Sequence, residues 1–348
     1  MFPRVDKQNG FESPIHELFT TDSGFHLPVG RDKKLMASQN MHNPPEPIKS
    51  DVQKPLVSYV VCSYNHEYYV EKAIRSIVDQ DYESIELIVV DDCSTDSSLK
   101  ILDQLKQEYN FKLIKNKKNK GIVRSVNIGV SHANGKYIVF HASDDISHAT
   151  RTGQQVAVLE NNCDAGFVCG ATRKVDHRGE VLVDWPIKMT HSYTFEDFYL
   201  RQPVIHAVAC MYRTSAVKKI TPLNESIPFE DLQLYWNVTR QNLVCIYDTS
   251  VQVIDYRILP SSLGRQKSKM YAGKIKFISA FESEPWYPKV LRRFKTQYLL
   301  ELAKSSKTEA FQFLLLEFGN IDLRHSHKVL AAFLMPKCII KRFFSKPY

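Results

Sequence analysis

Several patterns that would place the chain in familiar classes of protein are absent from its sequence. Its seven cysteines form no CxxC pair and no metal-ligand spacing, and their odd number favours a reducing compartment over a disulfide framework. No apolar run approaches the roughly 20 residues that a membrane-spanning helix needs, and the first residues, MFPRVDKQNGFESP, contain no apolar signal core. No GxGxxG follows the first apolar run, so the chief signature of a nicotinamide-dependent dehydrogenase is missing. We therefore expect a cytoplasmic protein, either soluble or peripheral to a membrane.

The composition is that of a globular protein with an excess of basic residues. The chain has 348 residues, of which 43% are apolar, enough for one large core or for a core and an appendage. Lys and Arg number 46 against 38 Asp and Glu, a formal charge of +8. Residues 324–348 hold six basic side chains and no acidic one. Such a tail suits an anionic surface, either nucleic acid or membrane headgroups, or forms a helix that packs on the folded domain with a solvated basic face.

The pattern of apolar residues divides the chain into an arm and an alternating α/β region. Residues 1–54 are rich in Pro, Asn, Asp and Lys without sustained periodicity, which predicts a disordered arm. From residue 55 to 160, strand-like runs alternate with helical spacing, the pattern of βαβ units in a parallel sheet. The expected strands are residues 56–62, 85–90, 111–114 and 136–141, and the expected helices are residues 69–79, 99–109, 121–133 and 151–161. This half is predicted to be a Rossmann-like nucleotide-binding unit.

The second half of the chain changes character twice. Residues 161–264 hold short apolar runs at 166–169, 204–212, 244–247 and 251–256, with helices expected at 195–200 and 231–241. We predict a mixed extension of the same sheet, which builds an acceptor pocket. Residues 265–348 are helical in pattern and basic, with no internal repeat. They are predicted to form a C-terminal helical appendage, with helices near 271–281, 288–303 and 308–318.

Polar or aromatic residues stand directly after apolar runs at four places. Ser63-Tyr64-Asn65, Asp91-Asp92 and Asp144-Asp145 each follow a predicted strand, and Glu230-Asp231 follows Pro228 at a predicted helix start. Open α/β sheets bind ligands at the carboxyl ends of their strands. The order therefore predicts an enzyme that handles a nucleotide and a metal.

The first two groups also have plain structural explanations. Tyr64 can stack on a flat base, or it can be an ordinary half-buried aromatic residue. Asp92 can accept a hydrogen bond from a pyrimidine N3–H, or it can cap a helix, which is the role we assign to Asp96.

The same holds for the two later acidic pairs. Asp144 and Asp145 can reach a ribose hydroxyl and a hard divalent cation, Mg²⁺ or Mn²⁺, that neutralises a diphosphate, or they can form a solvated turn. Glu230 and Asp231 are favoured at a helix start by the macrodipole, yet a carboxylate fixed there is also well placed as a general base.

Three segments together resemble a known family. They are PLVSYVVCSYNHEYYVEKAIRSIVDQDYESIELIVVDDCSTDSS, NKGIVRSVNIGVSHANGKYIVFHASDD and FEDLQLYW. Over about residues 55–260, in order and spacing, the chain is similar to family 2 of the glycosyltransferases, inverting enzymes that use nucleotide sugars and have the GT-A fold. The resemblance implies a GT-A domain over residues 55–264, with a nucleotide-binding half at 55–160 and an acceptor half at 161–264.

The resemblance implies a role for Tyr64 and for three carboxylates of the nucleotide half. Tyr64 would stack on the base and Asp92 would contact its edge. Asp144 would lie near the ribose, and Asp145 would coordinate the divalent cation.

It implies further roles on the acceptor side and around the nucleotide. Asp231 would be the general base that deprotonates an acceptor hydroxyl, with Glu230 orienting the site. Glu67 would brace the first loop. Arg124 and Asn127 would help to hold the diphosphate or nucleoside, although Arg124 can equally belong to a solvated helix face.

Three positions depart from the usual family pattern. Cys62, in the nucleotide-binding set, replaces a small hydroxyl residue, and Ala142 stands where many relatives carry an additional Asp. Tyr256-Arg257 begins a late motif that usually continues to a His near the diphosphate, but Leu259 occupies that place. These departures keep an alternative open, a nucleotide-sugar-binding protein of the same fold that has lost catalysis.

The expected function is transfer of a sugar from a nucleotide-diphosphate sugar to a hydroxyl of a saccharide or lipid-linked acceptor, in surface polysaccharide or glycoconjugate synthesis. The basic C-terminal region would bring the enzyme to the inner face of the cell membrane. No nucleic-acid partner is expected, because the basic residues cluster outside the sheet without a recognised motif.

Overall fold

The computed structural model describes residues 54–259, 267–322 and 333. The predicted N-terminal arm, the domain boundary near residue 264 and most of the basic tail lie outside these residues. The described cysteines are all free thiols. Among the described helices, none combines the length and the apolar character that crossing a membrane requires.

A 10-stranded mixed sheet forms the centre of the described α/β part. Its order is β3-β2-β1-β4-β9-β6-β10-β5, with β7 beside β6 and β8 beside β10. The strands are β1 (Val57–Ser63), β2 (Ile85–Asp91), β3 (Lys112–Lys115), β4 (Tyr137–Ala142), β5 (Ile146–Ser147), β6 (Ala165–Val175), β7 (Val181–Val183), β8 (Thr190–Tyr193), β9 (Cys210–Arg213) and β10 (Val244–Arg257). Strands β1 to β4 run parallel, whereas β9 pairs antiparallel with both β4 and β6. The predicted parallel half and its mixed extension are therefore confirmed.

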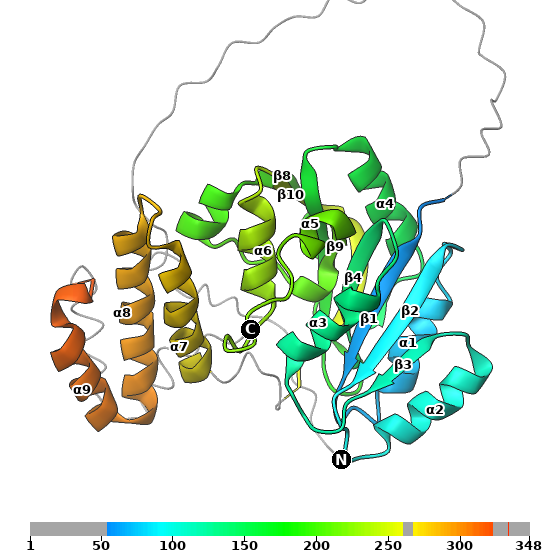
Figure 1. The fold of residues 1–348 in the computed structure, drawn as a ribbon, viewed down its shortest axis with the longest axis horizontal. Helices are drawn as coiled ribbons and strands as arrows, with labels where there is room; N and C mark the ends of the chain where they lie inside the picture. Colours follow the sequence, from blue (N-terminus) through cyan, green and yellow to red (C-terminus); the bar gives the residue numbers. More distant parts are fainter. Residues whose placement is uncertain (1–53, 260–266, 323–332, 334–348) are drawn as a thin grey trace, which may run out of the picture. The chain divides into compact units, whose positions relative to one another are not determined.

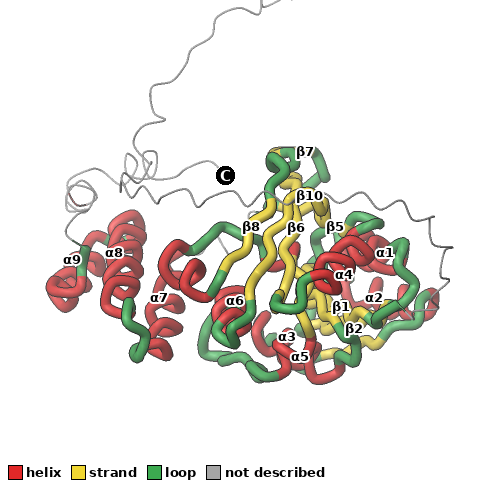
Figure 2. The backbone as a smooth tube through the Cα atoms, turned by 90° about the horizontal axis from the view of Figure 1, so that it is seen from above, coloured by secondary structure: helices red, strands yellow, loops and turns green. Residues whose placement is uncertain are grey.

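Helices cover both faces of this sheet (Figure 2). The helices on the two faces are α1 (Val70–Val78), α2 (Ser98–Glu108), α3 (Ile122–His132), α4 (Arg151–Asn161), α5 (Thr214–Lys218) and α6 (Asp231–Thr239). Three further helices, α7 (Lys267–Ile278), α8 (Tyr287–Ser305) and α9 (Lys307–Glu317), lie beyond α6 (Figure 2). Because strand side chains alternate, Tyr59 packs with α1, α2 and α4, while its neighbour Val60 packs with α3 on the other face. The observed fold is therefore α/β, as the sequence predicts, with helices on both faces of a mixed sheet.

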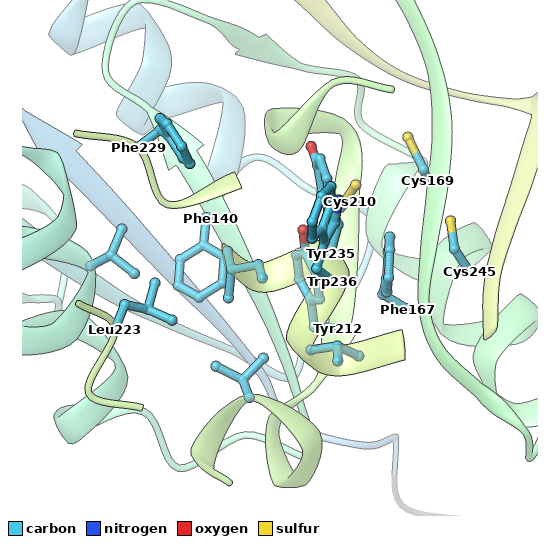
Figure 3. Packing of buried hydrophobic residues seen from close by; sticks show 14 of the residues in the cluster. Phe140, Phe167, Cys169, Cys210, Tyr212, Leu223, Phe229, Tyr235, Trp236 and Cys245 are labelled. Atoms are coloured by element: carbon cyan, nitrogen blue, oxygen red, sulfur yellow. The ribbon is translucent and has the colours of Figure 1, made fainter. Parts of the chain in front are cut away.

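Aromatic rings fill the core on the side of α3 and α6 (Figure 3). The Phe167 ring stacks on Tyr212 and Tyr235, with centroids 4.8 and 5.7 Å apart. Trp236, fully buried, follows Tyr235 on α6. These two side chains anchor α6 in the core, so they also fix the place where the helix begins, at Glu230 and Asp231.

The C-terminal helices continue this core beyond α6 (Figure 1). The Trp236 ring lies 5.3 Å from Phe277 of α7 and 6.4 Å from Phe294 of α8. Helix α8 in turn packs on α9 through a smaller cluster that includes Leu299 and Ala310. Within the described residues, α7 and α8 thus pack directly against α6 and share its hydrophobic core.

Sequence periodicity predicts the first half more closely than the second. The eight elements expected in residues 55–160 end within one residue of those observed. The runs 244–247 and 251–256 belong to one strand, β10. They look separate in the sequence because the pairing of β10 with β6 shifts register between Asp248 and Gln252, which interrupts the alternation of apolar residues. The helix expected at 195–200 is a π-helix, η2 (Asp197–Arg201), and the run 204–212 divides into a 3₁₀ turn, η3 (Ala207–Ala209), and β9.

Replacing Trp236 by Ala is expected to lower the free energy of unfolding by about 3–5 kcal/mol, because the variant leaves a cavity between α6, α7 and α8. Urea unfolding followed by circular dichroism measures this loss. The control is Leu316→Ala, whose side chain is 84% exposed and whose removal should change stability by no more than about 0.5 kcal/mol. A loss below 1 kcal/mol for the Trp236 variant would show that α6 is not anchored by this residue.

Candidate active site

The strand register brings the first three polar groups to one edge of the sheet. Cys62 pairs with Val90 of β2 and with Ala142 of β4, and Ser63 pairs with Asp91. The loops that follow β1, β2 and β4 therefore leave the sheet side by side, as the sequence predicts.

Reciprocal hydrogen bonds tie the β1–α1 loop to the β2–α2 loop. The Ser97 N–H donates to Glu67 Oε2 at 3.0 Å, and the Glu67 N–H donates to Asp96 Oδ2 at 3.0 Å. The Thr95 N–H donates to Asn65 Oδ1 at 2.8 Å, and Asn65 holds a left-handed φ of 54°. Glu67 thus braces this pair of loops, and Asp96 also caps α2 through the Ser98 N–H.

Tyr64 lies at the end of β1, immediately before the tied loops. Its side chain is 41% exposed, so one part of the ring is open to a flat partner. Its stacking on a base remains a prediction.

Asp92 holds the β3–α3 loop against the end of β2. Its carboxylate is buried and accepts hydrogen bonds from Asn116 Nδ2 at 2.8 Å, from the Lys120 N–H at 2.9 Å and from the Gly121 N–H at 2.7 Å. Gly121, with a φ of 85°, begins the turn into α3. Asp92 therefore shapes the wall of the site. Its predicted contact with the edge of a base stays a prediction.

Asp144 and Asp145 follow β4 and are held by the end of β10. Arg257, at the end of β10, donates its backbone N–H to Asp145 Oδ1 at 2.7 Å and its Nε–H to the Asp144 carbonyl at 2.8 Å. The other oxygen of Asp145, Oδ2, is buried and has no hydrogen-bond partner. Burial and the neighbouring Asp144 raise the pKa of Asp145 well above its usual range. Burial also raises the pKa of Asp144, against the charges of His66 and Arg257.

The pair suits a divalent cation that takes its remaining ligands from a substrate. The described residues contain no group of three or more His, Cys, Asp or Glu side chains that could hold a metal ion alone. Mg²⁺, however, is usually bound through one or two carboxylates together with substrate phosphates. The unpartnered Oδ2 of Asp145 is an oxygen of the required kind.

Sequence reasoning missed the residues that support this pair. His66 lies 3.9 Å from Asp144 Oδ1, and its Nδ1 is hydrogen-bonded to Ser143 Oγ at 2.8 Å. Its ring meets Tyr69 edge-on at 6.3 Å, and the Arg257 guanidinium lies over the Tyr69 ring at 4.7 Å. Only the position of Arg257 within the late motif pointed to any of them.

Arg124 and Asn127, on α3, contact the segment that leads to α6. Arg124 forms a salt bridge with Glu225 at 2.8 Å, with both side chains 43% exposed. Asn127 exchanges hydrogen bonds with the backbone of Leu223, at 2.9 and 2.7 Å. These contacts connect α3 to the acceptor half, and the predicted binding of nucleotide by the two residues stays a prediction.

Glu230 and Asp231 begin α6 and face different neighbours. Burial, followed by the charges of Glu230 and Asp92, raises the pKa of the Cys62 thiol, so Glu230 lies near the end of β1. Burial and Asp231 raise the pKa of Glu230 to about 7. Burial also raises the pKa of Asp231, against the N–H of Leu232 and the charge of Lys274 from α7.

The comparison with protein families agrees with this geometry. A family model described as glycosyl transferase family 2 matches residues 58–221. Residues 58–221 therefore belong to this glycosyltransferase family. This assignment favours an enzyme over a protein that only binds nucleotide sugars.

The glycosyltransferase has curated relatives along most of its length. It is 28% identical over 293 residues to an uncharacterized glycosyltransferase of Haemophilus influenzae, covering 80% of this chain and 84% of that protein. It is 28% identical over 222 residues to the Escherichia coli UDP-Glc:alpha-D-GlcNAc-diphosphoundecaprenol beta-1,3-glucosyltransferase WfgD, covering 62% of this chain and 81% of that protein.

Solved structures show the same fold at lower identity. Staphylococcus aureus TarS, residues 1–349 in complex with UDP-GlcNAc, is 18% identical with a TM-score of 0.55, covering 80% of this glycosyltransferase and 79% of that chain. The mannosyltransferase PcManGT from Pyrobaculum calidifontis, in complex with GDP-Man and Mn²⁺, is 15% identical with a TM-score of 0.53, covering 85% of this chain and 89% of that chain. The predicted GT-A fold is confirmed.

Replacing Asp92 by Ala is expected to destabilise the glycosyltransferase by about 1–3 kcal/mol, because partly buried N–H donors lose their acceptor. Amide hydrogen exchange at Lys120 and Gly121 should accelerate in the variant. The control is Asp103→Ala, which removes a salt bridge to Lys115 between side chains about half exposed and should cost no more than about 1 kcal/mol. Unchanged exchange at Gly121 would contradict the role given to Asp92.

Proposed function

We propose that this glycosyltransferase inverts the configuration of a sugar as it moves that sugar from a nucleotide diphosphate to a hydroxyl of a saccharide or lipid-linked acceptor. The main support is the approach of Glu230 to Cys62 at the end of β1. This approach brings the acid pair of α6 toward the sheet edge that carries Asp92, Asp144 and Asp145.

Asp231 is the general base of the proposed reaction. Its Oδ1 accepts the Leu232 N–H at 2.7 Å, and its Oδ2 is the oxygen assigned to the acceptor. That oxygen takes the proton of the acceptor hydroxyl, whose oxygen forms a bond to the anomeric carbon as the bond to the diphosphate breaks. One displacement inverts the anomeric centre without a covalent intermediate, so a nucleophilic Ser or Cys is not required.

Asp145, with Asp144 beside it, is the proposed holder of a divalent cation, Mg²⁺ or Mn²⁺. The cation supplies positive charge that neutralises the leaving diphosphate. The Arg257 N–H fixes Asp145 Oδ1, so the unpartnered Oδ2 is the oxygen that would hold the ion. The Mn²⁺ present with PcManGT supports this assignment.

The substrates are proposed from the relatives and from the sequence. TarS is solved with UDP-GlcNAc, and WfgD is named for UDP-Glc and a diphosphoundecaprenol-linked acceptor. A relative in Bacillus subtilis, TuaG, is named as a putative teichuronic acid biosynthesis glycosyltransferase. These names support a nucleotide-sugar donor and an acceptor from polysaccharide synthesis. The further proposal that the reaction takes place at the cytoplasmic face of a membrane rests on the basic residues of 324–348, which would bind anionic headgroups.

Thermal unfolding with UDP, GDP, dTDP and CMP sugars, each with and without Mn²⁺, should identify the donor. Ligand at 100 times its Kd stabilises by about 2.7 kcal/mol, which raises Tm by roughly 5–10 °C in a domain of this size. Mn²⁺ should increase the shift for the true donor. The matched variant Asp145→Asn should keep the metal-free shift and lose the added effect of Mn²⁺. No shift with any of the four classes would contradict a nucleotide-sugar donor.

Replacing Asp231 by Asn tests the base. The amide keeps an acceptor for the Leu232 N–H but cannot take a proton at neutral pH, so kcat for release of nucleoside diphosphate in the presence of acceptor should fall by about 10²–10⁴-fold. Donor affinity, measured by calorimetry, should change by less than about threefold.

Glu230→Gln is the matched comparison, because Glu230 is assigned to orient the site. A larger loss of kcat in this variant than in Asp231→Asn would transfer the role of base to Glu230. Wild-type-like turnover in Asp231→Asn would overturn the proposed mechanism.

A further inference from the structure

Helix α7 packs directly against the segment that ends in the acid pair. Gly273 has no side chain, and a Cβ atom built there would lie 2.5 Å from Pro228 Cδ and 3.0 Å from Phe229 Cε1. One turn later, the Phe277 ring meets Phe229 edge-on at 6.0 Å. The close approach requires glycine, and it places the next residue of α7, Lys274, beside the start of α6.

The Lys274 ammonium group is held by aromatic rings and not by a close carboxylate. It lies 5.0 Å from the ring centroid of Tyr271 and 5.7 Å from that of Phe294. The described residues form no salt bridge with it within 4.0 Å. Cation–π contacts of this kind orient a charge without neutralising it.

The charge of Lys274 acts on Asp231 across this longer distance. Burial raises the pKa of Asp231, and the charge of Lys274 lowers it. Conversely, burial lowers the pKa of Lys274, and the charge of Asp231 raises it. A direct salt bridge would occupy a carboxylate oxygen, whereas attraction at longer range occupies neither oxygen of Asp231.

The other charged and titratable groups around Asp231 do not replace this cation. Glu230 precedes it on α6 and is acidic, and Tyr235 lies one turn further along the same helix with a pKa raised by burial. Arg293 of α8 faces Lys274 and donates to the Leu200 carbonyl. Among the described residues, Lys274 is the cation whose charge lowers the pKa of Asp231.

We propose that Lys274 is a positioning residue that keeps Asp231 ionised while leaving one of its oxygens open to the acceptor hydroxyl. The proposal rests on the proposed function of Asp231 as the base. It makes α7, which lies beyond the matched family segment 58–221, part of the active site.

The test measures the ionisation of Asp231 directly. The full chain is labelled with [4-¹³C]aspartate, and the carboxyl resonance missing from Asp231→Asn is assigned to Asp231. Its pKa should rise by roughly 0.5–1 unit in Lys274→Met, because an opposite charge nearby favours the carboxylate. Lys274→Arg should restore the wild-type value. The matched control is Lys276→Met, an exposed lysine on the same helix, which should leave the pKa within 0.2 unit, about the error of such a titration.

The pH dependence of kcat gives the second readout. A base needs to be ionised, so a higher pKa of Asp231 moves the acidic limb of the profile to higher pH by the same amount. Above both pKa values, Lys274→Met should recover to within a few fold of the wild type, whereas damage to the fold alone would lower kcat equally at every pH. If Lys274→Met does not fold, Lys274→Gln takes its place with the same expectations.

The titration separates this inference from the proposed function. An unchanged or lower pKa of Asp231 in the folded Lys274 variant overturns the role of Lys274, whatever the activity. A raised pKa together with full activity of Asp231→Asn would keep the electrostatic coupling but overturn the role of Asp231 as base, and with it the positioning role.

Discussion

The buried guanidinium of Arg257 is the constraint that joins the two halves of the site. The residue is 4% exposed, and a charge removed from water is costly unless carbonyl or carboxylate oxygens surround it. Its partners are the carbonyls of Asp144 and Asp176, at 2.8 and 2.7 Å, while its backbone N–H fixes Asp145. The hydrogen bonds of Arg257 therefore hold the end of β10, a late strand in the sequence, against the residues that follow β4. The geometry of Asp144 and Asp145, the pair proposed to hold a metal, depends on that connection.

The second acid pair is also fixed by contacts with distant parts of the chain, but the contacts are of another kind. Glu230 and Asp231 are held by a helix whose position is set by aromatic packing, through Tyr235 and Trp236, rather than by hydrogen bonds from a strand. Each acid pair lies near a cation, Arg257 in the first and Lys274 in the second. The two cations differ in how they act. Arg257 contacts the pair directly and organises it, whereas Lys274 remains at a distance. This difference suits the proposed roles, in which the first pair binds an ion and the second exchanges a proton.

The sequence predicts the first half of the fold because the signals there are local. Hydrophobic periodicity locates β1 to β4 and their helices, and the parallel order then places the polar ends together. What it could not predict depends on tertiary contacts. Asp92 is indistinguishable in sequence from a residue that caps its own helix, yet it binds the β3–α3 loop, and its neighbour Asp91 holds the Ser94 hydroxyl instead. His66 reaches Ser143 across 77 residues. No periodicity carries that information.

The acceptor side shows why the later part of the chain resists prediction most. Its acid pair has an ordinary capping explanation, and α7 reads as one more basic helix. The decisive feature is a glycine, Gly273, that has no chemical function and no unusual φ. The reason for a glycine at this position is visible only in the folded structure, where Pro228 and Phe229 occupy the space that a Cβ atom would need. Shape complementarity at this point brings Lys274 toward Asp231, so a steric condition on one residue determines the electrostatic environment of another. A pattern of residue types along the chain does not contain that steric condition, because the condition is set by the distance between α7 and the segment that leads into α6.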